Sequence, residues 1–65
     1  MRKEITLHAY QLEVGDLIFW DGQYLLVHDL KGSYIRGRGL MVDVSLSDGW
    51  HRMEIMFVLK VFRHV

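Results

Sequence analysis

The sequence predicts an all-β fold, a small twisted barrel of five or six strands. Turn signals made of glycine and aspartate recur roughly every 6 to 10 residues, a spacing that suits short strands better than helices. Residues 40–47 alternate between apolar and polar side chains, the pattern of a strand with one buried face and one wet face. Residues 10–14 offer the only helical alternative, and a helix of that length is not stable by itself.

The size of the chain limits its stability. Its 65 residues make a single domain over residues 1–65, and a domain this small buries only about 60% of the surface that its unfolded chain exposes. The sequence has no cysteine, so no disulfide can compensate, which suits a reducing compartment. The remaining sources of stability are a dense apolar core, drawn from the 51% of residues that are hydrophobic, and self-association.

The charge balance argues against some classes of function and favours others. Lys and Arg number 8, Asp and Glu number 8, and the formal net charge is zero. A nucleic-acid-binding domain usually carries a clear basic excess, so this balance argues against one, while a charge near zero favours association between proteins. No apolar run approaches the roughly 18 residues of a membrane span, and no apolar stretch follows Arg2 and Lys3 as in a signal peptide. We therefore expect a cytoplasmic protein that does not bind membranes.

The turn signals and the apolar runs between them give the order of the elements. Strands are predicted at residues 4–8, 17–20, 23–30, 40–47, 50–55 and 59–64. Asp21-Gly22 and Asp48-Gly49 each join two strands in a hairpin, and Asp21-Gly22 suits the positive φ angles of a type I′ turn. The first strand is expected to pair with the last and to close the sheet, which removes exposed edges.

Smaller features complete the predicted barrel. The side chains expected to be buried in the strand 40–47 are Val42, Val44 and Leu46, and those expected to be exposed are Asp43 and Ser45. Leu12 and Val14 are expected to plug one end of the barrel, just before the turn at Gly15. Residues 56–58 are expected to form a single helical turn ahead of the last strand.

The order of the turn motifs resembles a known layout. Leu12-Glu13-Val14-Gly15-Asp16 precedes a strand, Asp21-Gly22-Gln23-Tyr24 follows it, and Ser47-Asp48-Gly49 lies further along the chain. This layout is similar to that of small uncharacterised proteins encoded by actinobacterial phages and their hosts, and the similarity covers nearly the whole chain. The resemblance implies a small β-barrel in a phage-like context, where the protein acts on a host component. Those proteins have no assigned activity.

A second resemblance is to the N-terminal barrel of elongation factor P and to related SH3-like barrels of translation. Those barrels run from a glycine-aspartate turn through two strands joined by an aspartate-glycine turn to a glycine-rich loop and a further strand. Here Ile35-Arg36-Gly37-Arg38-Gly39-Leu40 occupies the place of that loop. The resemblance implies an SH3-like barrel. The nearest lysine is Lys31 and the flanking proline is missing, so the sequence departs from the translation factor at its modified lysine.

The segment from Lys31 to Gly39 is predicted to be a loop and is the most distinctive part of the sequence. Its candidate binding residues are Lys31, Tyr34, Arg36 and Arg38, to which Arg52 is added from a later strand. Basic residues beside an aromatic ring can hold a phosphate backbone and stack on a base. The alternative is a solvated hairpin loop whose arginines keep the protein soluble.

The residues of catalytic and metal sites form no recognisable pattern. Asp16, Asp21 and Asp48 each adjoin a glycine in a turn, where an aspartate caps the backbone with its own side chain. The sequence lacks a nucleophile elbow, a phosphate-binding glycine loop ahead of a helix, and the histidine spacing of a zinc site. His8 and His64 would come together only through pairing of the first and last strands. We therefore expect no enzyme, no metal and no cofactor.

Apolar side chains occur on both faces of several predicted strands. A barrel has a single interior, so part of these side chains should lie outside it. We expect them to be covered in a homo-oligomer, with a symmetric dimer as the simplest form. The candidate residues for self-association are Trp20, Tyr24, Leu26 and Phe62. The alternative is that strand bulges turn both sets of side chains inward.

These observations favour a non-catalytic interaction module. We expect it to bind a protein partner, such as a host protein, to associate with itself, or to do both. The alternative function is the binding of RNA or single-stranded DNA through the loop Lys31–Arg38.

Overall fold

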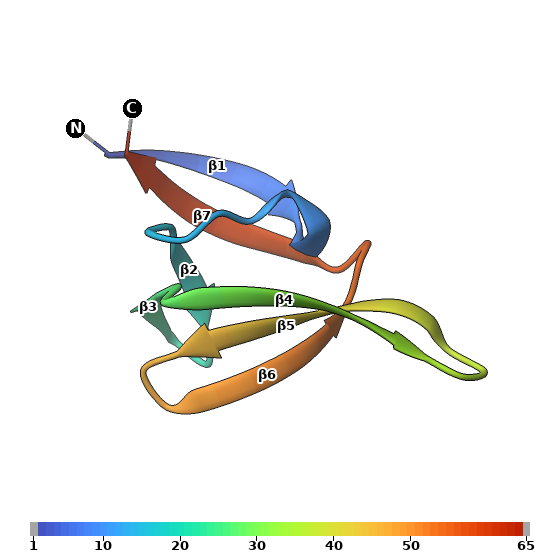
Figure 1. Cartoon of the computed structure of the whole chain (residues 1–65). Helices are drawn as coiled ribbons and strands as arrows, with labels where there is room; N and C mark the ends of the chain where they lie inside the picture. Colours follow the sequence, from blue (N-terminus) through green and yellow to red (C-terminus); the bar gives the residue numbers. More distant parts are fainter. Residues whose placement is uncertain (1, 65) are drawn as a thin grey trace.

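The computed structural model describes residues 2–64 and confirms the all-β class. Its strands are β1 (Arg2–His8), β2 (Leu17–Trp20), β3 (Gln23–Leu26), β4 (Asp29–Ile35), β5 (Gly39–Leu46), β6 (Gly49–Glu54) and β7 (Val58–His64), and a 3₁₀ helix, η1 (Ala9–Gln11), follows β1. The described residues thus form seven strands, where the sequence predicted five or six. They lie in two antiparallel sheets, ordered β1-β7-β2-β3 and β4-β5-β6 (Figure 1).

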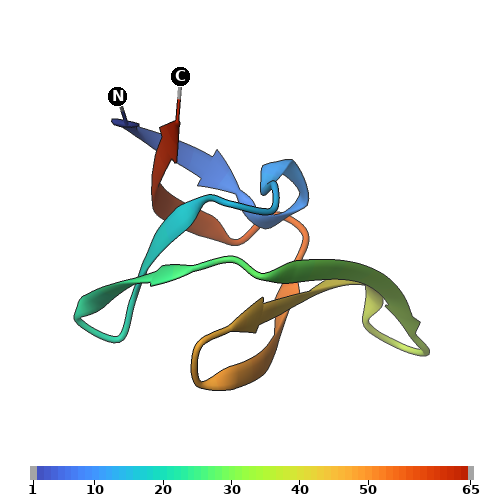
Figure 2. The same ribbon diagram turned by 60° about the vertical axis from the view of Figure 1, so that its left-hand side comes forward.

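The chain passes from one sheet to the other through a bend at Val27 and His28 (Figure 2). The N–H of Val27 donates to the carbonyl of Asp16 at 2.8 Å, next to β2. The N–H of His28 donates to the carbonyl of Ser45 at 2.8 Å, in β5. Each residue of the bend is therefore held by a different sheet, and the single strand predicted at residues 23–30 is divided into β3 and β4.

The second part of that strand continues far into the predicted loop. β4 pairs with β5 in a regular antiparallel ladder from Asp29 to Ile35, so the prediction of a loop from Lys31 to Gly39 was wrong for most of its length. Only three residues turn, at 36–38, where the N–H of Arg38 donates to the carbonyl of Ile35 at 2.9 Å. Gly37 has φ 86° there, which a type II turn requires at its third position.

The hairpin of β4 and β5 projects from the body of the molecule (Figures 1 and 2). We call residues 30–42 the arm. The molecule measures 39 × 21 × 19 Å along its principal axes, so it is about twice as long as it is wide. A two-stranded ribbon that leaves the core in this way exposes both of its faces beyond the point where the body ends.

The first and last strands pair as predicted. β1 lies antiparallel to β7, with Ile5 opposite Val61, and β7 pairs with β2 on its other side. The strand pairing of residues 2–64 does not close into a barrel, because β6 forms no ladder with β1. Backbone hydrogen bonds from Ala9 to Phe57 (2.8 Å) and from Tyr10 to Ile55 (3.1 Å) connect the two sheets at this side.

The core lies between the two sheets. Its largest fully buried side chains are Ile18, Val27, Val44 and Val61, which come from both sheets and from the bend. In β5, Val44 and Leu46 are buried as predicted and Val42 is half-buried. Asp43 and Ser45 are half-buried and not exposed as predicted, and Asp43 is covered by the guanidinium of Arg52 on the neighbouring strand.

The connecting segments contain two wrong predictions. Leu12 is buried as expected, but Val14 is 62% exposed, because it lies in the turn before β2 and points away from the core. Residues 56–58 form no helical turn. The chain instead reverses at Ile55 and Met56, and Val58 already begins β7. The predicted turn at Asp21-Gly22 is confirmed by φ angles of 50° and 82°, both positive as a type I′ turn requires.

Candidate interaction surfaces

The outer face of the four-stranded sheet carries an apolar surface outside the core. Side chains of a strand alternate between faces, and directly paired residues share a face. The pairs Leu17–Leu26, Leu17–Phe62 and Phe19–Tyr24 therefore place five side chains together on the side away from Ile18. We call these residues the aromatic face. Its members are Leu17, Phe19, Tyr24, Leu26 and Phe62.

The rings of the aromatic face pack against one another. The ring centroids of Tyr24 and Phe62 are 4.6 Å apart, and those of Phe19 and Tyr24 are 5.1 Å apart in an edge-on arrangement. Phe19 remains 43% exposed and Tyr24 38% exposed, so water reaches the centre of the cluster. This face brings together three of the four residues predicted for self-association, Tyr24, Leu26 and Phe62.

Trp20 does not belong to this face. It lies on the same side of β2 as the buried Ile18, packs against the core and contacts His51 and Phe57, with ring centroids 5.3 and 6.0 Å away. The prediction that Trp20 shares an outer surface with Tyr24 was therefore wrong. The alternation along β2 separates the two residues, and sequence alone did not decide which set faced inward.

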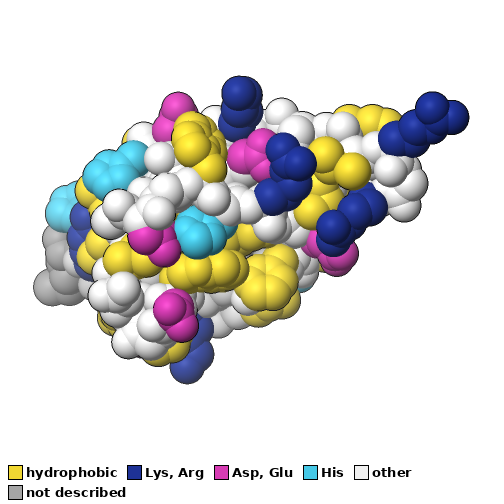
Figure 3. Space-filling view, turned by 90° about the horizontal axis from the view of Figure 1, so that it is seen from below, with side chains coloured by type: hydrophobic (Ala, Val, Ile, Leu, Met, Phe, Trp, Pro, Cys, Tyr) yellow, Lys and Arg dark blue, Asp and Glu magenta, His cyan; other side chains and the backbone are white. Residues whose placement is uncertain are grey.

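The predicted basic residues occupy the arm and the strand beside it. Lys31 and Tyr34 lie on β4, Arg36 and Arg38 lie in or beside its terminal turn, and Arg52 lies on β6. Figure 3 shows Lys and Arg side chains on the projecting end of the molecule, with acidic side chains among them. The structure therefore gathers these residues at one end of the molecule.

Two of these cations are paired with carboxylates. Arg52 Nε donates to Asp43 Oδ1 at 2.8 Å, and Arg38 Nη2 lies 3.6 Å from Glu54 Oε1. The guanidinium of Arg52 holds the pKa of Asp43 below its usual value, so this carboxylate stays charged beside the arm. Acidic groups thus interrupt the basic residues, and a continuous basic stripe, which nucleic-acid binding favours, does not form over them.

The neutral net charge nevertheless hides a separation of charge along the chain. Residues 30–42 contain Lys31, Arg36 and Arg38 and no Asp or Glu, so the arm carries a formal charge of +3. The other five Lys and Arg residues and all eight Asp and Glu residues lie elsewhere, which leaves the rest of the chain at −3. The arm is therefore a basic extension of an acidic body.

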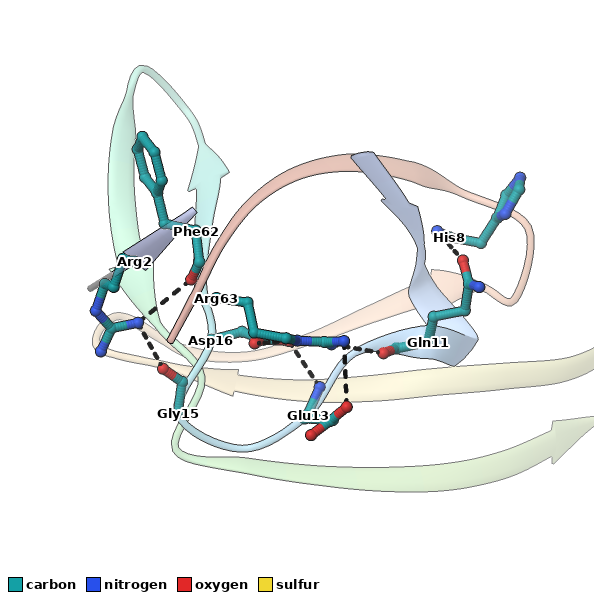
Figure 4. Close-up of polar contacts among 8 residues, drawn as sticks. All are labelled: Arg2, His8, Gln11, Glu13, Gly15, Asp16, Phe62 and Arg63. Carbon is teal, nitrogen blue, oxygen red and sulfur yellow. Dashed lines mark hydrogen bonds and ion pairs between the residues drawn. The ribbon is translucent and has the colours of Figure 1, made fainter. Parts of the chain in front are cut away.

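A part-buried ion pair joins the end of β7 to the loop before β2 (Figure 4). Arg63 Nε and Nη2 donate to the two carboxylate oxygens of Asp16 at 2.9 and 2.8 Å. Nη2 also donates to the carbonyl of Gln11 at 2.9 Å, and Nη1 lies 3.2 Å from Glu13 Oε2. Asp16 further accepts the N–H of Glu13 at 2.8 Å. The polar groups of Asp16 and Arg63 thus all have protein partners. This arrangement is typical of a structural anchor, which we call the anchor of β7.

The pKa of Asp16 reflects these contacts. Burial raises the pKa of its carboxyl group, but the hydrogen bonds from Arg63 and from the Glu13 N–H, with the charge of Arg63, outweigh burial and hold the pKa below its ordinary 3.8. A carboxylate with a lowered pKa contributes stability above its unfolded-state pKa of about 3.9 and loses it as the pH falls through the folded-state value.

We therefore expect the free energy of unfolding to fall as the pH drops below about 4. Urea denaturation at a series of pH values between 7 and 2.5, followed by tryptophan fluorescence, measures this. In the Asp16→Asn variant the protein is less stable at pH 7, and the further loss in acid is smaller, because the group that titrates is gone. An equal acid-dependent loss in wild type and variant would contradict the assignment to Asp16.

The histidines do not come together. β1 and β7 are neighbours, but their antiparallel register places His8 opposite Val58 and His64 opposite Arg2, at the two ends of the ladder. Within residues 2–64, no group of three His, Asp or Glu side chains is arranged as a metal site. No helix in the same range has the length and apolar character needed to cross a membrane.

Comparison with known proteins adds no relative. No protein-family model matches the sequence, and neither the curated proteins nor the solved structures contain a match. The resemblances to phage-encoded barrels and to elongation factor P therefore stay predictions.

Sequence reasoning missed two members of the aromatic face, Leu17 and Phe19, and the anchor formed by Asp16 and Arg63. The signal for Leu17 and Phe19 was present, because both alternate with Ile18 in a strand that is apolar on both faces. The anchor left no such signal, since its two residues are 47 positions apart.

Proposed function

We propose that this protein is a non-catalytic interaction module that forms a symmetric homodimer through the aromatic face. The observation that carries the proposal is the packed cluster of Phe19, Tyr24 and Phe62, which lies outside the core and stays accessible to water. Apolar side chains scattered singly over a surface need no explanation, but a contiguous cluster with its rings already ordered is typical of interaction sites. Aromatic rings in such a cluster lose little conformational entropy on binding.

The composition of the aromatic face, and the charged residues around it that form its rim, favour a second copy of the protein as the partner. A two-fold interface brings the same surface of both copies together, so a flat apolar sheet face can pair with itself. Arg2, Glu4 and Lys60 lie on the same outer face around Phe62, so the rim carries charges of both signs. A two-fold axis can place Glu4 of each copy beside a cation of the other. The net charge of zero adds no repulsion between copies.

The size of the chain fits this assembly. A stable interface covers about 800 Å² on each partner. The molecule exposes 4481 Å², so a dimer of that kind covers roughly a fifth of it. Such burial adds apolar contact to a small domain that has no disulfide.

The arrangement of the strands supports an SH3-like description of the module. One segment, β3 to β4, serves both sheets through its bend, as strands do at the corners of small barrels. The hydrogen bonds from η1 to the turn before β7 bridge the side at which no ladder forms. We infer a partly open SH3-like barrel whose outer face, and not its filled interior, is used for binding.

Sedimentation equilibrium between 1 and 100 µM protein tests the dimer. We expect wild type to approach twice the monomer mass of 7.7 kDa with rising concentration. Phe19→Asp and Tyr24→Asp each place a charge in the centre of the aromatic face, and we expect both variants to remain monomeric because a buried unpaired charge is strongly unfavourable. Both side chains are partly exposed, so circular dichroism should show an unchanged fold.

Val58→Asp is the matched control. Val58 lies on the same outer face of β7 but at its far end, away from the aromatic face, and is exposed. This variant should still dimerise. A wild-type monomer at 100 µM would overturn the proposal. Binding of random single-stranded DNA or RNA tighter than about 1 µM at physiological salt, and lost in Arg36→Ala combined with Arg38→Ala, would favour the nucleic-acid function instead.

A further inference from the structure

An apolar groove lies between the arm and the segment of η1, on a different surface from the aromatic face. Its volume is about 330 Å³. Apolar side chains from η1 and its loop, from both strands of the arm and from the turn after β6 line it, namely Tyr10, Leu12, Leu30, Leu40, Val42 and Ile55. Leu40 is 61% exposed, and Tyr34, its cross-strand partner on the same face, is 70% exposed. The apolar face of the arm thus continues past the core with nothing from residues 2–64 covering its end.

Gly32 leaves part of the groove wall without a side chain. It lies in the middle of β4, opposite Val42 and on the same face, and it is one of the residues that line the groove. A Cβ atom placed on it would meet no other atom within 4 Å, and its backbone is not in the left-handed region that glycine alone favours. The backbone therefore does not require glycine here. The absence of a side chain leaves space that an incoming group can fill.

The outer edge of the strand beside the groove pairs with no other strand among residues 2–64. β4 is the outermost strand of its sheet, paired with β5 on one side only. The N–H of Leu30 donates to the side chain of the preceding residue, at 2.8 Å from Asp29 Oδ1. This N–H therefore points away from β5. N–H directions alternate along a strand, and the N–H of Gly32 therefore points to the same free edge. An edge of this kind accepts an extended peptide as an additional strand.

The charge of the arm indicates which side chains an added peptide strand should carry. Side chains of an added strand next to Gly32 would enter the groove, and those next to Lys31 would lie on the opposite, polar face of the sheet. The arm carries +3 with no acidic residue. Asp43 lies opposite Lys31 on this face, but its carboxylate is held by Arg52, and among residues 2–64 Lys31 and Arg36 form no ion pair. Apolar side chains therefore suit one face of the added strand, and acidic side chains suit the other.

We propose that the groove binds an extended peptide in which apolar and acidic side chains alternate, added as a strand to the free edge of β4. The apolar side chains fill the space over Gly32 between Tyr10 and Leu40. The acidic side chains approach Lys31 and Arg36. This site does not depend on the dimer, because the aromatic face belongs to the other sheet.

The test uses a fluorescein-labelled hexapeptide of alternating valine and aspartate, with binding followed by fluorescence anisotropy. We expect wild type to bind it with a Kd below about 1 mM, the range of a short peptide held at one edge. Lysine in place of aspartate should abolish binding. Methylation of alternate peptide nitrogens should abolish it too, because the added strand then cannot donate its hydrogen bonds.

Gly32→Ile is the decisive variant. The isoleucine side chain fills the groove, and a β-branched residue suits a strand better than glycine, so the variant should fold at least as well as wild type. We expect its affinity for the peptide to fall at least about tenfold. Thr6→Ile, a matched change on β1, an edge strand of the other sheet, should leave the affinity unchanged.

Several outcomes would overturn the proposal. The first is that Gly32→Ile and wild type bind the aspartate peptide with equal affinity. The second is that wild type binds the aspartate and lysine peptides equally well. The third is that wild type shows no binding at 1 mM peptide. A dimer that dissociates in Gly32→Ile would show that a second copy occupies the groove and would also overturn it. Failure of the dimer proposal is seen separately, as a wild-type monomer in sedimentation, a result that leaves the peptide measurement unaffected.

Discussion

Replacing Asp16 with alanine is expected to lower the free energy of unfolding by about 3 kcal/mol, because it leaves the Arg63 guanidinium in a largely covered site without its main partner. The loss includes the bidentate contact at 2.8 and 2.9 Å and the hydrogen bond from the Glu13 N–H. A domain of this size has a total stability of roughly 3 to 10 kcal/mol. The variant should therefore lose between about a third and all of the stability of the domain. Urea denaturation followed by tryptophan fluorescence measures the change.

Asp43→Ala is the control for this experiment. Asp43 also pairs with an arginine, Arg52, but that guanidinium is about half exposed and remains solvated when its partner is removed. Exposed ion pairs contribute little to stability, so this variant should lose no more than about 1 kcal/mol. Similar losses in the two variants would show that the pair of Asp16 and Arg63 does not anchor β7.

Ile18→Ala is expected to destabilise the fold by about 3 kcal/mol, through lost apolar transfer energy and the cavity that remains. Ile18 is fully buried, and its strand pairs with β7 through Val61 and with β3 through Leu25. Three strands therefore lose contacts at once, and a tightly packed centre can relax only in part. Thermal and urea denaturation give the loss of stability.

Ile18→Val and Val58→Ala are the comparison variants for Ile18→Ala. Ile18→Val removes a single methylene and should lose about 1 kcal/mol. Val58 is exposed, and its replacement with alanine should change the stability by no more than about 0.5 kcal/mol. If Ile18→Ala unfolds as easily as Val58→Ala, the centre of the core has been placed wrongly.

The strands that sequence predicted best have both a turn signal and a simple pattern. β2 was predicted residue for residue, because Asp21-Gly22 fixes its end and the turn at Gly15-Asp16 precedes it. The pairing of β1 with β7 followed from the need to cover edges. Each of these predictions rests on local chemistry or on a rule that holds for all sheets.

The predictions that failed depend on where chain segments meet. Residues 31–35 look like a loop because glycine, serine and charge are common in loops, yet they form a strand because β5 supplies the partner. The bend at Val27 carries no glycine or proline to announce it. Trp20 and Tyr24 are both apolar and four residues apart, but only the packing of the second sheet decides that Trp20 faces inward.

The position of β7 has a consequence for the order of folding. Among residues 2–64 it follows all the other strands, yet it lies inside the four-stranded sheet, between β1 and β2. Until residues 58–64 have been synthesised, β1 and the β2–β3 hairpin have no strand to join them, and a nascent chain on the ribosome has only its local hairpins to form. Assembly of this sheet therefore waits for β7 and closes the long loop between β1 and β7, which is characteristic of slow folding.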